Sequence, residues 1–167
     1  MLFRSTQMGM PKPGRTVLHD SAREIGELMK RQGGRRVSEI REELGTMMNE
    51  KVAVFRDHAG LTEAHEIVRR LKDEAKSATI DDRGTVFNQD VLGAIELGYM
   101  LDVAECIVVG ALERKESRGA QFRTDFPKRN DDEWLKHIDL VGDHGGPPKV
   151  EYSPVTITQW EPMERTY

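Results

Sequence analysis

One stretch, from just after Asn88 to about Lys115, constrains the fold of this chain more than any other feature, because no turn signal interrupts it. A helix of this length would be roughly 40 Å long at 1.5 Å per residue. Residues 103–112 are apolar nearly all round, which is typical of a helix that other helices enclose. We therefore predict that this helix is the central, most enclosed member of a bundle. Residues 107–109 could instead form a buried strand, although they continue the helical pattern without a break.

Three shorter helices are predicted before it, from apolar residues that recur three to four positions apart. The first opens with a capping-box spacing at Ser21 and covers residues 21–34, where two glycines stop it. The second covers residues 38–55, and residues 58–60 are interpreted as a break. The third covers residues 62–78, so a helical bundle is expected.

The end of the chain, residues 119–167, is predicted to be a loop-rich tail with two short elements. Asn130 has the position of an N-cap for a short helix that includes Ile138. Alternating apolar residues in 150–157 indicate one extended edge segment, since Pro154 could not pair in a central strand.

These elements together predict an all-α fold. Its core would be a three-helix antiparallel bundle of the spectrin-repeat type over residues 38–118, followed by the tail over 119–167. Residues 1–20 show little apolar periodicity and are expected to be a flexible leader before a domain covering residues 21–167.

Charge and composition exclude several classes of function. The formal net charge of -4 provides no broad positive field, so nucleic-acid binding is not expected. The apolar run 106–112 is far shorter than the roughly 20 residues of a membrane-spanning helix, so no membrane insertion is expected. The single cysteine, Cys106, lies in an apolar run and is predicted to be buried and reduced. The N-terminal residues lack the apolar segment of a secretory signal, which favours a cytoplasmic setting.

No catalytic, cofactor-binding or metal-binding residue is predicted in this chain. A dinucleotide site needs a glycine-rich turn between a strand and a helix, and residues 142–146 have neither element beside them. The five histidines include no pair three or four positions apart. Ser117 has no histidine signature of an activated nucleophile. Glu96, Asp102 and Glu105 could act as acids or bases if buried, but their positions on the long helix favour its surface.

The most distinctive local pattern is the charged segment after the long helix, residues 113–133. Basic and acidic side chains occur there in equal numbers, which does not suit a phosphate site. Such a balance suits bidentate ion pairs that hold a loop or a partner surface, although a solvated charged loop remains an alternative.

A resemblance to a known family rests on this segment and on an ordered set of shorter matches. Arg114 followed by the Glu-Ser-Arg-Gly motif at 116–119 is the strongest part. Over residues 21–167 the chain resembles the C-terminal helical domain of succinate dehydrogenase and fumarate reductase flavoproteins. The other matches, in the order typical of that family, are Ile40-Arg41, Val54-Phe55-Arg56, Phe87-Asn88, Ala94-Ile95-Glu96-Leu97, Asp131-Asp132 and Trp134-Leu135-Lys136-His137.

Two details refine this resemblance. L-aspartate oxidases carry a similar motif, but residues 150–155 and the final Arg165-Thr166-Tyr167 look more like succinate dehydrogenases. The family usually has His where this chain has Gln121, and Gln cannot titrate near neutral pH.

The resemblance implies a structural role within a larger enzyme. The family oxidises succinate to fumarate with a covalently held FAD and passes the electrons to an iron–sulfur subunit. The residues for that chemistry lie upstream in the flavin and capping domains, so this chain alone is expected to be inactive and to bind no cofactor. Its partners would be those two domains and the iron–sulfur subunit, peripheral to the inner membrane. The residues expected to join the long helix to the tail or to these domains are Arg114, Glu116, Ser117, Arg118, Gly119, Arg123 and Asp125.

Three interpretations remain open at this point. The chain is an excised or truncated flavoprotein domain, or a free-standing helical interaction module that keeps a docking surface without the chemistry. The third is an unrelated spectrin-like adaptor.

Overall fold

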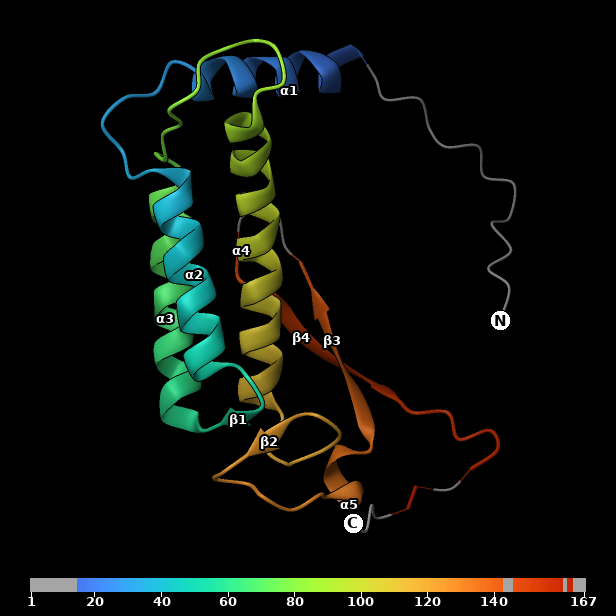
Figure 1. The fold of residues 1–167 in the computed structure, drawn as a ribbon. Helices are drawn as coiled ribbons and strands as arrows, with labels where there is room; N and C mark the ends of the chain where they lie inside the picture. Colours follow the sequence, from blue (N-terminus) through green and yellow to red (C-terminus); the bar gives the residue numbers. More distant parts are fainter. Residues whose placement is uncertain (1–14, 143–145, 161, 164–167) are drawn as a thin grey trace.

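Three long helices lie side by side in the computed structural model, which describes residues 15–142, 146–160 and 162–163 (Figure 1). They are α2 (Val37–Lys51), α3 (His58–Ala75) and α4 (Gln89–Glu113). α2 and α4 run in one direction and α3 runs in the other (Figure 1). A further helix, α1 (Arg15–Leu28), lies across the ends at which α2 and α4 begin.

The core lies where the apolar stripes of these helices meet. The buried positions recur three to four residues apart, as expected for helices that each bury one face. They include Ile40, Leu44 and Met47 from α2, Leu61, Ala64, Val68 and Leu71 from α3, and Leu97, Leu101, Ala104, Val108 and Ala111 from α4. The helical part of the predicted fold is thus confirmed, and residues 107–109 are helical. Along the described ranges, no helix is both long and apolar enough to cross a bilayer.

The helix starts match the predictions only in part. α4 begins after Asn88, whose side chain accepts a hydrogen bond from the backbone N of Val91 at 2.9 Å. Residues 58–60 are the first turn of α3 and not a break, because the Asp57 side chain accepts a 2.7 Å hydrogen bond from Gly60 N. The predicted cap at Ser21 is wrong, since this residue lies inside α1. Residues 15–20 of the expected leader also belong to α1, and residues 1–14 lie outside the described part.

The tail contains the extended segment predicted over 150–157, which overlaps β4, and also strands that the sequence did not predict. α5 (Asp131–Trp134) starts at the expected cap Asn130, but it is only one turn long. Ile138 lies not in that helix but in β3 (Lys136–Val141), which pairs antiparallel with β4 (Lys149–Pro154). β1 (Phe55–Arg56) and β2 (Phe122–Arg123) form a short parallel pair. The described residues therefore form a helical domain with two small sheets, and an all-α description is too narrow.

α4 has a smaller share of exposed residues than α2 or α3, but it is enclosed on one face and not all round. One of its faces is buried against α2 and α3, and β3 contacts its C-terminal end. Large apolar side chains on the rest of the helix are exposed, among them Tyr99 and Val103. Cys106 is accordingly only half-buried. The apolar pattern correctly predicted a helix, but the described elements do not cover every side of α4.

Candidate functional site

The predicted site residues lie together at the C-terminal end of α4, where the chain turns back towards β1 and the start of α3 (Figure 1). The turn is tight: Arg118 N donates to Gln121 O at 3.0 Å, and Gln121 N donates to Arg118 O at 3.1 Å. Gly119 supplies the left-handed backbone that this turn requires, with φ of 61°. Gly119 lies within this turn and not directly after α4, which ends at Glu113.

Glu116 is the centre of the cluster and is fully buried. One carboxylate oxygen, Oε1, accepts hydrogen bonds from Arg114 Nη1 and Arg118 Nε, both at 2.7 Å. The other, Oε2, accepts from Arg118 Nη2 at 3.0 Å and from Asn130 N at 2.8 Å. Burial raises the pKa of Glu116, but the hydrogen bonds from Arg118, Asn130 N and Arg114 outweigh it and lower the pKa. All the carboxylate's acceptor capacity is used within the chain.

The partners of Glu116 extend the cluster into the tail. Arg118 Nη2 also donates to Asp131 Oδ1 at 2.5 Å, at the first residue of α5. Arg114 donates to the backbone oxygens of Trp134 at 3.0 Å and Lys136 at 2.7 Å. Its guanidinium carbon lies 5.7 Å from the Trp134 ring centroid. The two arginines therefore hold α5 and the start of β3 against the end of α4.

A second ion pair, between Arg123 and Asp125, joins two helix ends. Arg123 is fully buried and donates through Nη1 to Ala111 O at 2.7 Å, near the C-terminus of α4. Its Nε and Nη2 donate to the two Asp125 oxygens at 2.8 and 2.7 Å. Asp125 in turn accepts from His58 N at 3.1 Å, at the first residue of α3. Positive charge at a helix C-terminus and negative charge at an N-terminus both suit the helix dipole.

Ser117 is occupied by structural hydrogen bonds. Its Oγ donates to Phe126 O at 2.8 Å and accepts from Arg123 N at 2.9 Å. Its backbone N donates to Lys128 O at 3.2 Å. Ser117 therefore fastens the loop that carries the Arg123–Asp125 pair.

Arg56 is a member of the cluster that the site prediction missed. It donates to Gln121 Oε1 at 2.9 Å and to Ala53 O at 2.6 Å, while Gln121 Nε2 donates to Arg114 O at 3.4 Å. Burial, and then the positive charge of Arg123, lowers the pKa of Arg56. The only available signal was the match of Val54-Phe55-Arg56 to the family, because 65 residues separate Arg56 from Gln121.

The three carboxylates noted on the long helix differ in their surroundings. Glu105 is buried, contrary to the expected surface position, and accepts from Lys72 Nζ at 2.6 Å. Asp102 is exposed and pairs with the same lysine at 2.8 Å. Glu96 is exposed and lies 3.7 Å from Arg41. These contacts join α4 to α3 and α2 and do not converge on a common site.

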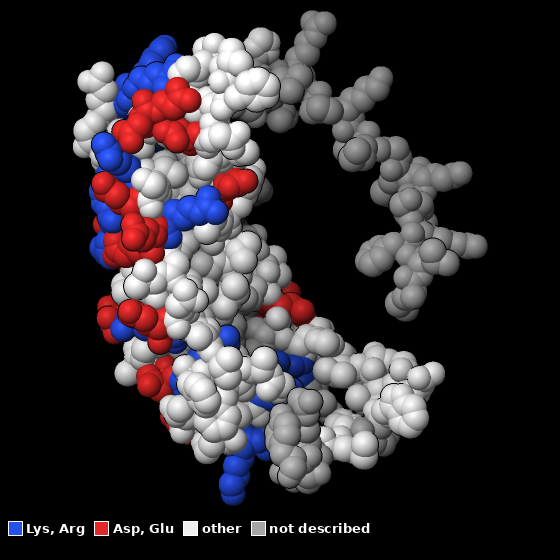
Figure 2. Space-filling model, in the orientation of Figure 1, with Lys and Arg blue, Asp and Glu red and all other residues white. Residues whose placement is uncertain are grey.

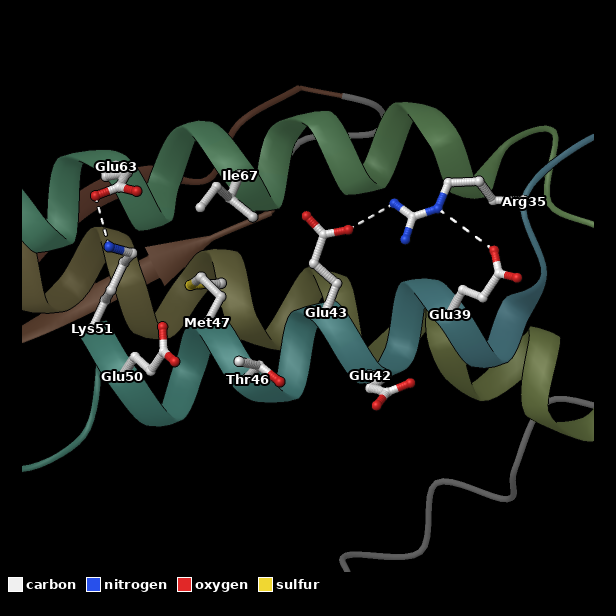
Figure 3. A pocket seen from close by; sticks show the side chains of 10 residues that line it. All are labelled: Arg35, Glu39, Glu42, Glu43, Thr46, Met47, Glu50, Lys51, Glu63 and Ile67. Carbon is white, nitrogen blue, oxygen red and sulfur yellow. Dashed lines mark hydrogen bonds and ion pairs between the residues drawn. The ribbon is translucent and has the colours of Figure 1, made fainter.

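Half of the residues that line a groove between α2 and α3 are glutamates (Figure 3). Two bases already neutralise part of this charge: Arg35 Nη1 lies 2.7 Å from Glu43, and Lys51 Nζ lies 2.7 Å from Glu63. In the described part of the chain, no group of three or more His, Cys, Asp and Glu side chains is placed to hold a metal ion.

The glycine-containing segment 142–146 does not have the setting of a flavin-pyrophosphate turn. It joins the antiparallel strands β3 and β4, and its residues 143–145 lie outside the described part. A pyrophosphate-binding turn leads instead from a strand into the N-terminus of a helix. No step of a flavin reaction is therefore assigned to this chain.

The ion pairs predict an acid-sensitive stability. Hydrogen bonding to Arg123 is the main cause that lowers the pKa of Asp125 from 3.8 to about 2. A lowered folded-state pKa contributes stability above the unfolded-state value, and this contribution is lost as pH falls from about 4 through about 2. We expect Asp125→Asn to lower Tm at pH 7 and the difference from wild type to shrink below pH 4, as measured by circular dichroism. A Tm difference that stays constant from pH 7 to pH 2 would contradict this assignment.

Comparisons with known proteins place this geometry in context. A family model described as "Fumarate reductase flavoprotein C-term" matches residues 41–167, which include the whole cluster. The fumarate reductase flavoprotein subunit of Haemophilus influenzae is 43% identical over 89% of this chain and 25% of its own length. A succinate dehydrogenase flavoprotein subunit from Rickettsia conorii is 33% identical over 87% of this chain and 25% of its own length. A solved chain of Escherichia coli quinol fumarate reductase superposes with a TM-score of 0.81 at 32% identity, covering 92% of this chain and 27% of that one.

Two consequences follow from these comparisons. The chain spans about a quarter of the length of the curated relatives it matches. The predicted preference for succinate dehydrogenase is not confirmed, because relatives named fumarate reductase have the higher identities. Of the residues behind that preference, Arg165-Thr166-Tyr167 lie outside the described part.

Proposed function

Since the chain belongs to the fumarate reductase flavoprotein C-terminal family, we propose that it is the C-terminal structural domain of a flavoprotein subunit that interconverts succinate and fumarate. Residues 41–167 match the family and include every member of the cluster around Glu116 and Arg123, and this observation carries the proposal. The proposal covers both reaction directions, because relatives with either name are similar to the chain.

The residues that carry out the reaction would lie in the other three quarters of the subunit. FAD and the substrate-binding residues would lie in the flavin and capping domains, and electrons would pass on to an iron–sulfur subunit. The complete subunit would lie on the cytoplasmic side of the inner membrane, held there by its partner subunits. The chain alone would be inactive and would bind no flavin.

Within that subunit, the cluster at the end of α4 would stabilise the domain itself and would not contact a partner. The Glu116 oxygens accept from donors of this chain, and the Arg123 guanidinium bonds to Asp125 and to backbone oxygens of α4. Charged groups so fully paired offer little to a partner surface. Their role would be to fix the positions of the tail, α3 and α4 relative to one another. Neighbouring domains would then pack against a defined surface.

A chimera tests this proposal. Residues 41–167 would replace the corresponding segment of the Haemophilus influenzae subunit, and FAD content and succinate-dependent dye reduction would be measured. We expect the chimera to retain FAD and turn over succinate, while the isolated chain with added FAD does neither. An unrelated helical domain of similar length in the same place serves as the control. Turnover by the isolated chain, or a chimera no better than that control, would contradict the proposal.

A further inference from the structure

An exposed apolar row runs along α4 on the side away from the core. Its members are spaced three or four residues apart, so they share one face of the helix. The row covers roughly 22 Å at 1.5 Å per residue. Tyr99 is 69% exposed and Val103 is 59% exposed. The full row is Leu92, Ile95, Tyr99, Val103 and Ile107.

Both ends of this face meet other parts of the chain. At the N-terminal end, Ile95 and Tyr99 line a groove beneath α1 together with Ile25 and Leu28. At the C-terminal end, Leu140 of β3 lies close to Gly110 of α4. A Cβ atom built on this glycine would be 3.5 Å from Leu140 Cδ1. α1 and the β3–β4 hairpin project from the same side of α4, whereas charged side chains gather over α2 and α3 (Figures 1 and 2). The exposed row is thus an apolar surface with α1 at one end and β3 at the other. Two exposed carboxylates lie beside it on α4, and both are paired: Glu96 with Arg41, and Asp102 with Lys72.

We expect another protein surface to pack on this row. Single exposed apolar side chains are normal in folded proteins, but a continuous row of large ones on one helix face marks an interaction site. A helix that is apolar all round is one that other protein surfaces enclose, and here α2 and α3 enclose only one side. The residues of the row carry no charge, so the cover must itself be apolar where it makes contact.

We propose that this α4 face is the surface on which the flavin-bearing remainder of the subunit packs, and that the cluster around Glu116 is not. The inference rests on the proposed function and identifies the partner surface within it. This chain spans about a quarter of its relatives, so three quarters of each relative's polypeptide is available as the cover. A second copy of the chain on this row would leave no apolar contact there for that larger portion.

The test uses the active chimera and a matched pair of variants. Val103→Asp places a carboxylate in the row. Val54→Asp makes the same substitution at a position of similar exposure, 52%, in the turn before β1. In the isolated chain both variants should melt within about 1–2 °C of wild type, because exposed substitutions have small effects on stability. In the chimera, Val103→Asp should speed FAD loss on heating by about tenfold or more, since it buries an unpaired charge. Val54→Asp should leave that rate unchanged.

The outcomes separate this inference from the proposed function. A chimera without FAD or turnover would contradict the proposed function and the docking surface with it. An active chimera in which Val103→Asp has no effect, or in which Val54→Asp has the larger one, would overturn the docking surface alone. An isolated chain that is dimeric in solution and becomes monomeric with Val103→Asp would show that a second copy covers the face. Tyr99→Lys is a second variant that tests the same row with the opposite charge.

Discussion

Replacing Arg123 with alanine should lower the free energy of unfolding by about 3–5 kcal/mol, the usual effect of removing one partner of a buried ion pair. The side chain is fully buried and bonds to Asp125 and to Ala111 O. Its loss would remove the guanidinium partner of Asp125, which would keep only the bond from His58 N, and the side-chain donor to the carbonyls of Ala111 and Leu112. Chemical unfolding followed by circular dichroism would measure the change.

The control for this variant is Arg129→Ala. Arg129 pairs with Asp131 at 2.6 Å, but both side chains are about 30% exposed. Partly exposed pairs contribute about 0–1 kcal/mol, so this variant should be nearly neutral. Equal effects of the two substitutions would mean that Arg123 does not join the ends of α3 and α4 as the contacts indicate.

Replacing Glu116 with alanine should have a similarly large effect, also about 3–5 kcal/mol, but with a different local signature. The change would leave Arg114, Arg118 and Asn130 N without their shared acceptor. Because Arg114 also holds Trp134 O, the tail should loosen around this buried tryptophan. We expect a red shift of Trp134 fluorescence at denaturant concentrations at which the helical circular dichroism signal is still native.

Two further variants make this experiment specific. Glu66→Ala changes an exposed glutamate of α3 and should leave both signals unchanged. Trp160→Phe removes the exposed second tryptophan, so that the fluorescence reports on Trp134. Loss of the helical signal together with the fluorescence change would refute a local role for Glu116 in holding the tail.

Local sequence signals predicted the parts of the fold that depend on neighbouring residues. Apolar spacing located α2, α3 and α4. The start of α4 after Asn88 and the cap Asn130 were predicted correctly, because each cap contacts a residue only three positions away. The start of α3 was missed because Gly60 resembles a break, whereas Asp57 stabilises it as part of the first turn. β3 was missed because its strand partner β4 lies beyond a loop, and neither strand is stable alone.

The sequence by itself determined the three long helices, the balance of charges after α4 and the family. Each of these is encoded by the type and spacing of residues close together along the chain. Only the tertiary structure decided which charges meet: Asp125 reaches His58 N across 67 positions, and Arg56 reaches Gln121 across 65. It also decided that Glu105 is buried and that one face of α4 is not. The physical reason is that burial and ion pairing depend on how elements pack in space, and helical periodicity shows which faces are apolar without showing what covers them.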